Sequence, residues 1–167
     1  MTVRPILRFP DPRLKQVAEP VAVFDDALRA LALDLVDTMR AAPGIGITAP
    51  HIGVLLRIVA IELPGSGEPR LYVNPELVSA SSESARHVEG SVSMPGVSED
   101  VERPARVGLR YRDIGGVEHS EDADGLLAVC LQHEIDQLDG VFWIQRLSRL
   151  RRERALKRYA RARDWRS

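Results

Sequence analysis

The order of the secondary-structure signals is the feature that most constrains how this chain can fold. Short segments rich in branched residues and bounded by Pro, Gly or Ser lie between helical segments, and strand and helix do not alternate regularly. The predicted strands are residues 56–61, 70–74, 77–80, 107–111 and 117–120, the last two joined by a turn at 113–116. Strands gathered between helices in this way predict an α+β protein with a largely antiparallel sheet.

Two amphipathic helices frame these strands. The first begins at Asp25 or Asp26, either of which can cap it, and carries apolar residues at helical spacing as far as Met39. The second is expected over residues 124–139 and ends at Gly140, a residue suited to a left-handed cap. On this second helix, Leu126, Cys130, His133 and Gln137 form one stripe that begins apolar and ends polar. Such a stripe is typical of a helix that lines a pocket, although a buried His bonded to a backbone carbonyl would give the same pattern.

Composition limits the class of protein. With 167 residues, 44% hydrophobic and 28% charged, the chain is expected to form one compact domain with a substantial core. We find no run of 18 apolar residues and no secretory leader, so a membrane span is not expected and the cytoplasm is the expected location. The single cysteine, Cys130, excludes an intramolecular disulfide.

The C-terminal segment is strongly basic. Residues 146–167 contain ten Arg or Lys residues against two acidic ones, in a chain whose formal net charge is −1. The rest of the chain is therefore acidic. Two interpretations stay open: a solvated terminal helix, or a contact for RNA or another polyanion through neutralisation of its phosphates.

Three motifs occur in a fixed order along the chain. They are GIGITAPH at residues 44–51, EGSVS at 89–93 and HEIDQLDG at 133–140. Together they resemble the three signatures of the peptide deformylases, G-x-G-x-A-A-x-Q, E-G-C-x-S and Q-H-E-x-D-H-x-x-G. The likeness continues through ILRFPDPRL, VNPEL and ADGLLAVC at residues 6–14, 73–77 and 123–130. The resemblance implies a deformylase-like domain over residues 1–150, with sheets around a central motif-bearing helix. A basic C-terminal helix at 146–167 would be part of the same domain.

The resemblance implies a function and a cofactor. Family members are cytosolic hydrolases that remove the formyl group from N-formylmethionine on new bacterial polypeptides, so the implied partners are N-terminal formyl-Met peptides. A divalent metal, iron(II), zinc or nickel, is held there by one Cys and two His, and its bound water attacks the formyl carbon. For some bacterial members the C-terminal helix docks near the ribosomal exit tunnel. The basic tail here is therefore expected to contact the ribosome.

Individual roles follow from the same resemblance. Glu134 would be the general base, and the oxyanion would be stabilised from the positions of His51 and the backbone N–H of Val92. The expected substrate-binding residues are Gly44, Ile45, Gly46, Glu89, Gly90, Leu126, Val129 and Cys130. The apolar members of this set suit a methionine pocket, and they suit ordinary core equally well. Arg103, where the family often has an arginine, is expected to be a solvated charge.

The motifs depart from the family at three positions that carry chemistry. Ser91 replaces the cysteine ligand, Gln137 the second histidine ligand, and His51 the oxyanion glutamine, whereas His133 and Glu134 are retained. A serine hydroxyl stays protonated at neutral pH, and a carboxamide is a weak donor, so both bind transition metals poorly. The favoured expectation is a protein that keeps the fold and the peptide pocket, binds metal weakly or not at all, and has lost or strongly weakened catalysis.

Two alternatives keep an active enzyme. In the first, His51 joins His133 and Glu134 in a rebuilt ligand set, which would be acceptable for zinc. In the second, no metal is used, and Ser91 acts as a nucleophile beside His133, with His51 or Glu134 orienting the base.

Overall fold

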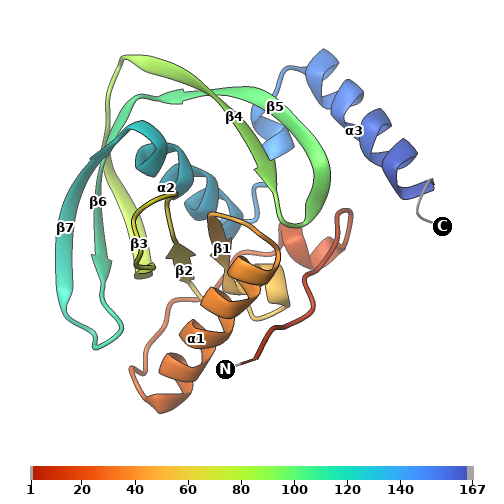
Figure 1. The fold of residues 1–167 in the computed structure, drawn as a ribbon. Helices are drawn as coiled ribbons and strands as arrows, with labels where there is room; N and C mark the ends of the chain where they lie inside the picture. The colour runs from red at the N-terminus through yellow and green to blue at the C-terminus, as the bar shows by residue number, and fades with distance from the viewer. Residues whose placement is uncertain (1, 165–167) are drawn as a thin grey trace.

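The computed structural model describes residues 2–164 and confirms an α+β architecture with antiparallel sheets. One sheet has five strands in the order β1-β2-β3-β6-β7, and the second is the two-stranded hairpin β4-β5. The strands are β1 (Gly46–Thr48), β2 (Ile58–Ile61), β3 (Arg70–Ala80), β4 (Ser84–Ser91), β5 (Met94–Pro104), β6 (Arg106–Arg112) and β7 (Glu118–Asp124). Figure 1 shows the helix α2 (Gly125–Leu138) at the centre, between the five-stranded sheet and the β4-β5 arch.

The predicted helices are present, and their ends follow from local chemistry. Helix α1 (Asp26–Ala41) is capped by Asp25, whose side chain accepts a hydrogen bond from the backbone N–H of Leu28 at 3.0 Å. Its apolar face packs against β1 and β2. Helix α2 ends at Leu138, and Gly140, just after the C-cap Asp139, adopts the expected left-handed conformation with φ of 75°. Three short 3₁₀ turns, η1 (Pro12–Lys15), η2 (Ala49–Ile52) and η3 (Trp143–Arg146), complete the pattern.

Strand β3 differs from the expectation of two separate strands at 70–74 and 77–80. The structure has one continuous strand with a register shift between Val73 and Glu76. Asn74 has φ of 50°, and its side chain both accepts from the backbone N–H of Val21 and donates to the carbonyl of that residue. This bulge accommodates Pro75 within the strand, because it removes the residue from the regular hydrogen-bond ladder.

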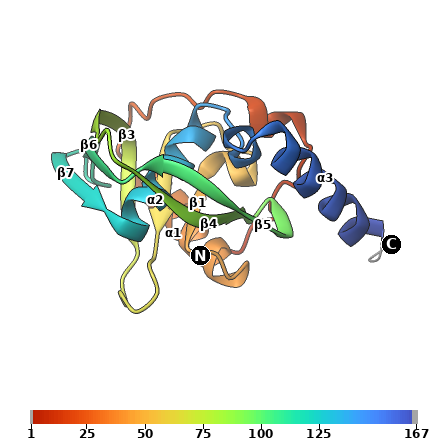
Figure 2. The ribbon, with the colours of Figure 1, turned by 90° about the horizontal axis from the view of Figure 1, so that it is seen from above.

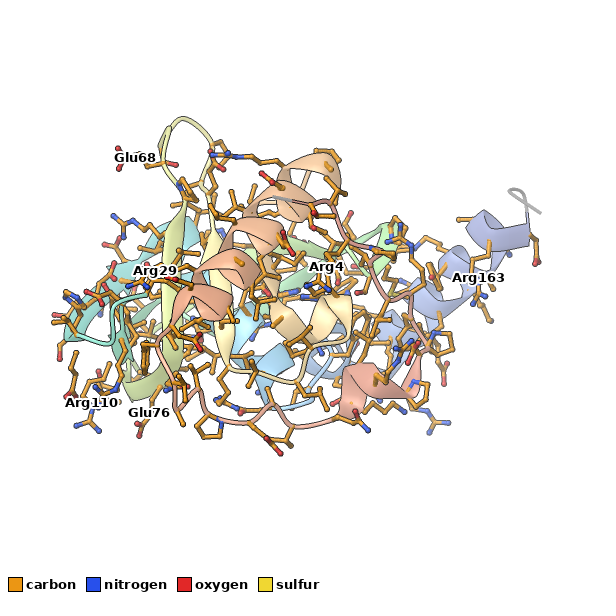
Figure 3. The ribbon with its side chains drawn as sticks, turned by 90° about the horizontal axis from the view of Figure 1, so that it is seen from below. Arg4, Arg29, Glu68, Glu76, Arg110 and Arg163 are labelled. Carbon is orange, nitrogen blue, oxygen red and sulfur yellow. The ribbon has the colours of Figure 1, made fainter. Side chains whose placement is uncertain are left out.

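Helix α3 (Arg149–Asp164) carries the basic tail and projects from the body of the molecule (Figures 1 and 2). Its buried residues Ala155 and Tyr159 join Met94, Val97 and Trp143 in one core cluster, which anchors this helix to the rest of the domain. Figure 3 shows Arg163 on this helix, far from the surface pair of Glu76 and Arg110 on β3 and β6. The predicted extent of this segment reaches residue 167, and residues 165–167 lie outside the described residues. Within residues 2–164, none of the helices is both long and apolar enough to span a bilayer.

Gly140 provides a test of how the end of α2 is packed. A Cβ at this position would overlap the carbonyl group of Lys15, so Gly140→Ala adds a steric clash to the strain of a positive φ. Gly125 is the matched control, because it also has a positive φ of 53° and nothing lies within 4 Å of its Cβ position. Gly125→Ala should cost only the conformational term, about 1–2 kcal/mol. We expect urea denaturation to show a clearly larger loss for Gly140→Ala, and equal losses would contradict the packing described.

Candidate active site: a cavity over helix α2

A cavity of about 440 Å³ lies where the loop before β1, the β4-β5 hairpin and α2 meet. Most of the residues singled out from the sequence line it: Gly44, Ile45, Gly46, His51, Glu89, Gly90, Ser91, Val92, Leu126, Val129, Cys130, His133 and Glu134. Gln137 is absent from this lining. Residues that the sequence did not single out also contribute, among them Arg8, Val88 and Met94. Arg8 comes from the N-terminal segment and donates to the carbonyl of Val92 at 2.5 Å.

Gln137 faces away from the cavity. Its side-chain nitrogen donates to the backbone carbonyl of Leu14 at 2.7 Å, and the residue is only 1% exposed. The contact ties α2 to η1, which lies far away in the sequence. The side chain therefore satisfies a buried carbonyl, which would otherwise lack a partner.

His133 is held by a chain of charged groups. Its Nδ1 lies 2.8 Å from Oε1 of Glu89, and Glu89 also receives two hydrogen bonds from Arg103 at 2.6 and 2.9 Å. Arg103 donates onward to Asp136 at 2.8 Å, and Asp136 is bound through both oxygens by Arg146. The partner of His133 is thus a carboxylate and not a backbone carbonyl.

Arg103 is buried, which corrects the expectation of a solvated charge. Only 5% of the residue is exposed, because Glu89 and Asp136 meet its guanidinium from two sides. Burial alone would raise the pKa of Glu89, but the hydrogen bonds from His133 and Arg103 outweigh it and hold this pKa below the ordinary value. For His133, burial opposes protonation, and the hydrogen bond to Glu89 with the charge of Glu134 raises the pKa nonetheless.

His51 is fixed in one tautomer by its own turn. The backbone N–H of Thr48 donates to Nδ1 of His51 at 2.9 Å, so this nitrogen must act as an acceptor. Complete burial, together with the nearby His133, lowers the pKa of His51 to about 3, and the imidazole is therefore neutral. Its remaining proton resides on Nε2, a buried atom with no hydrogen-bond partner.

Glu134 is buried beside these two histidines without a donor. Its Oε2 has no hydrogen-bond partner and lies 4.0 Å from Nδ1 of His51, and its Oε1 lies 3.9 Å from Nε2 of His133. Burial raises the pKa of this carboxyl to about 7. This value suits a general base near neutral pH.

The donors around the cavity do not form a conventional metal site. Within residues 2–164, no group of three His, Cys, Asp or Glu side chains is arranged to hold a metal ion. Ser91 contributes a hydroxyl whose oxygen accepts a hydrogen bond from the backbone N–H of Ser93 at 3.1 Å. Over the same part of the chain, no hydrogen bond joins Ser91 to His133.

Cys130 lines the cavity but is buried, and burial raises the pKa of its thiol to about 12. Alkylation requires the thiolate, so native protein should react with iodoacetamide at pH 8 at least about tenfold more slowly than unfolded protein. Mass spectrometry of the labelled chain gives the rate directly, because Cys130 is the only cysteine. Equal rates in buffer and in guanidinium chloride would show that the thiol is not buried.

Comparison with known proteins decides the family. The sequence model described as polypeptide deformylase matches residues 3–153. The chain belongs to the polypeptide deformylase family. Deformylases are metal-dependent hydrolases that act on the N-formyl group of nascent chains.

Relatives match this deformylase-family chain along nearly its whole length. It is 66% identical to a protein named peptide deformylase-like from Brucella melitensis, over 95% of this chain and 97% of the relative. It is 52% identical to a peptide deformylase from Phenylobacterium zucineum, over 95% of each chain. The crystal structure of a peptide deformylase from Legionella pneumophila superposes with a TM-score of 0.93 at 38% identity, covering 99% of this chain and 98% of that one. The deformylase fold with a C-terminal helix is therefore confirmed.

Proposed function

We propose that this chain is a cytoplasmic deformylase-family protein that binds peptides with an N-terminal methionine and hydrolyses the formyl group weakly or not at all. Ser91 and Gln137 stand at the motif positions where the family has its Cys and second His ligands. Structural zinc sites are worth about 10–16 kcal/mol, and the loss of two of three strong ligands removes a large share of that.

The contact made by Gln137 carries the proposal. Its amide donates to the carbonyl of Leu14 and does not line the cavity, so it offers no donor to an ion beside His133. Ser91 offers a neutral hydroxyl in place of a thiolate, which is a much weaker partner for a transition metal. His133 alone remains of the family's ligand set. The residues present therefore do not fit the family's metal.

The two alternatives that keep an active enzyme receive less support. A rebuilt set would need a lone pair on His51, but Nδ1 accepts the N–H of Thr48 and Nε2 carries the proton. A Ser91 nucleophile would need a base at hydrogen-bond distance, but within residues 2–164 its hydroxyl makes no hydrogen bond to His133 and accepts the backbone N–H of Ser93.

An apolar wall on the cavity supports peptide binding. Ile45, Leu126 and Val129 keep an apolar wall on the cavity, and Ile45 and Leu126 remain partly exposed at it, 37% and 39% respectively. A wall of this kind accommodates an apolar side chain such as that of methionine.

Calorimetry with formyl-Met-Ala-Ser and Met-Ala-Ser, together with a formate-release assay, tests the proposal. We expect binding of at least one peptide and no appreciable formate. Leu126→Asp should abolish binding, whereas Leu150→Asp, at an exposed apolar residue of α3, should leave it unchanged. The absence of heat at millimolar peptide would refute retained binding, and sustained formate release would refute lost catalysis.

We also propose that the basic helix α3 belongs to the same domain as residues 1–150 and contacts the ribosome. Burial of Ala155 and Tyr159 supports the first point. For the second, Arg154, Lys157 and Arg161 are exposed on the helix and free to meet phosphates. Changing these three to Gln should abolish salt-sensitive co-sedimentation with ribosomes and leave thermal stability unchanged. Unaltered co-sedimentation of the triple variant would contradict this contact.

A further inference from the structure

We infer that the polar end of the cavity binds an α-ammonium group, so that the preferred ligand is a peptide with a free N-terminal methionine and not a formylated one. The inference rests on the proposed function, because it selects among the peptides that the cavity would admit. It is carried by Glu134, a buried carboxylate that lines the cavity without a donor.

The surroundings of Glu134 contrast with those of Glu89. Glu89 receives two hydrogen bonds from Arg103 and one from His133, so its charge is fully matched inside the protein. Glu134 receives none: among the contacts of residues 2–164, its neighbours are imidazole nitrogens at 3.9 and 4.0 Å, beyond hydrogen-bond length. A buried acceptor left in this state destabilises the protein, and more so when it is charged.

His51 cannot supply the missing donor. The nitrogen that it turns toward Glu134 is Nδ1, and this atom already accepts the N–H of Thr48. The donor of His51 is Nε2–H, which is itself buried without a partner. Among residues 2–164 no protein group supplies this donor, so Glu134 is open to a donor from the cavity, whether solvent or ligand.

An ammonium group fits this demand better than a formyl amide. It brings three donors and a positive charge to a carboxylate with an unpartnered oxygen, whereas a formamide brings one N–H and no charge. Cys130 lies one helical turn before Glu134 on α2, so both present their side chains on the same face. The amine and the apolar side chain of an N-terminal residue are attached to the same α-carbon. The amine can therefore contact Glu134 while the apolar side chain contacts Cys130. Nε2–H of His51 remains for a carbonyl oxygen of the same ligand.

Calorimetry at pH 7.5 with three probes tests the inference: Met-Ala-Ser, formyl-Met-Ala-Ser, and the desamino analogue 4-(methylthio)butanoyl-Ala-Ser. We expect Met-Ala-Ser to bind at least about tenfold more tightly than either of the others, which corresponds to one charge-assisted hydrogen bond. The isosteric Glu134→Gln variant should bind all three within about twofold of one another, since a neutral amide does not select for charge. Circular dichroism confirms that the variant is folded.

The outcomes separate the two proposals. Equal or tighter binding of formyl-Met-Ala-Ser to the wild-type chain overturns this inference and leaves the proposed peptide binding intact. Retention of the full preference for Met-Ala-Ser in Glu134→Gln also overturns it, because the amine would then be recognised elsewhere. A wild-type chain that binds none of the three probes overturns both.

Discussion

Replacing Arg103 by methionine is expected to lower the free energy of unfolding by about 3–5 kcal/mol, the usual cost of leaving one partner of a buried ion pair uncompensated. Arg103 makes two hydrogen bonds to Glu89 and one to Asp136, and it is 5% exposed. Its loss would leave Glu89 as a buried carboxylate with only His133 for a partner. Urea denaturation at pH 7.5 measures the effect.

Arg106→Met is the matched control for this prediction. Arg106 also pairs with a glutamate, Glu83, at 2.9 Å, but both side chains are exposed, so its loss should cost less than about 1 kcal/mol. Similar losses for Arg103→Met and Arg106→Met would show that burial of the Glu89 pair does not matter. Such a result would contradict the structure.

The pH dependence of the free energy of unfolding gives a second test of the same prediction. The folded-state pKa of Glu89 is held below its ordinary value of 4.5, so the pair stabilises the wild-type protein above that pH and is lost as the pH falls through the lowered pKa. In Arg103→Met, burial acts without the arginine and raises the pKa of Glu89, so the variant gains stability as the pH falls and this carboxyl is protonated. The stability gap between the two proteins should therefore narrow from pH 7.5 toward pH 4.5.

Restoring two ligands at once is expected to have the largest effect on chemistry. The double variant Ser91→Cys and Gln137→His should take up about one zinc or nickel ion per chain, because a thiolate and two imidazoles form a strong ligand set. It should also release formate from formyl-Met-Ala-Ser. Metal should raise its melting temperature, since a ligand that binds only the folded state stabilises it.

The single variants serve as the controls for this experiment. Gln137→His alone removes the hydrogen bond to the carbonyl of Leu14, so it should lose about 1 kcal/mol of stability and gain little affinity for metal. Ser91→Cys alone still lacks the second imidazole, because Gln137 is unchanged, so it should also gain little affinity for metal. Metal uptake by either single variant, equal to that of the double variant, would show that the two positions do not act as one site. A double variant that folds but takes up no metal would show that the site differs from the family's metal site at more than these two residues.

Much of the fold was predictable because its signals are local. The apolar spacing in α1, the cap at Asp25 and the left-handed Gly140 depend on neighbouring residues, and the structure confirms all three. The β4-β5 hairpin was not predicted. Its strands carry many charged and exposed residues, such as Arg86, Asp100 and Glu102, so they lack the clear apolar alternation that marks a strand. Met94, which lines the cavity from this hairpin, was missed for that reason.

The motifs pointed to the residues that line the cavity. They did not reveal the burial and hydrogen-bond partners of the side chains in and around it. The burial of Arg103 depends on Asp136, 33 residues away, and the contact of Gln137 depends on Leu14, 123 residues away. Contacts between residues so far apart produce no periodic pattern in the sequence, so neither could be predicted from it. The tautomer of His51 is different, since it is set by Thr48 within the same turn, and a capping pattern of this kind is visible at short range.

The metal content of the purified wild-type chain tests the central claim most directly. After growth with iron, zinc and nickel and extensive dialysis, atomic emission should find far less than one ion per chain, because Ser91 and Gln137 do not replace a thiolate and an imidazole. One tightly held ion per chain, with release of formate from formyl-Met-Ala-Ser, would contradict the account and make this protein a working deformylase.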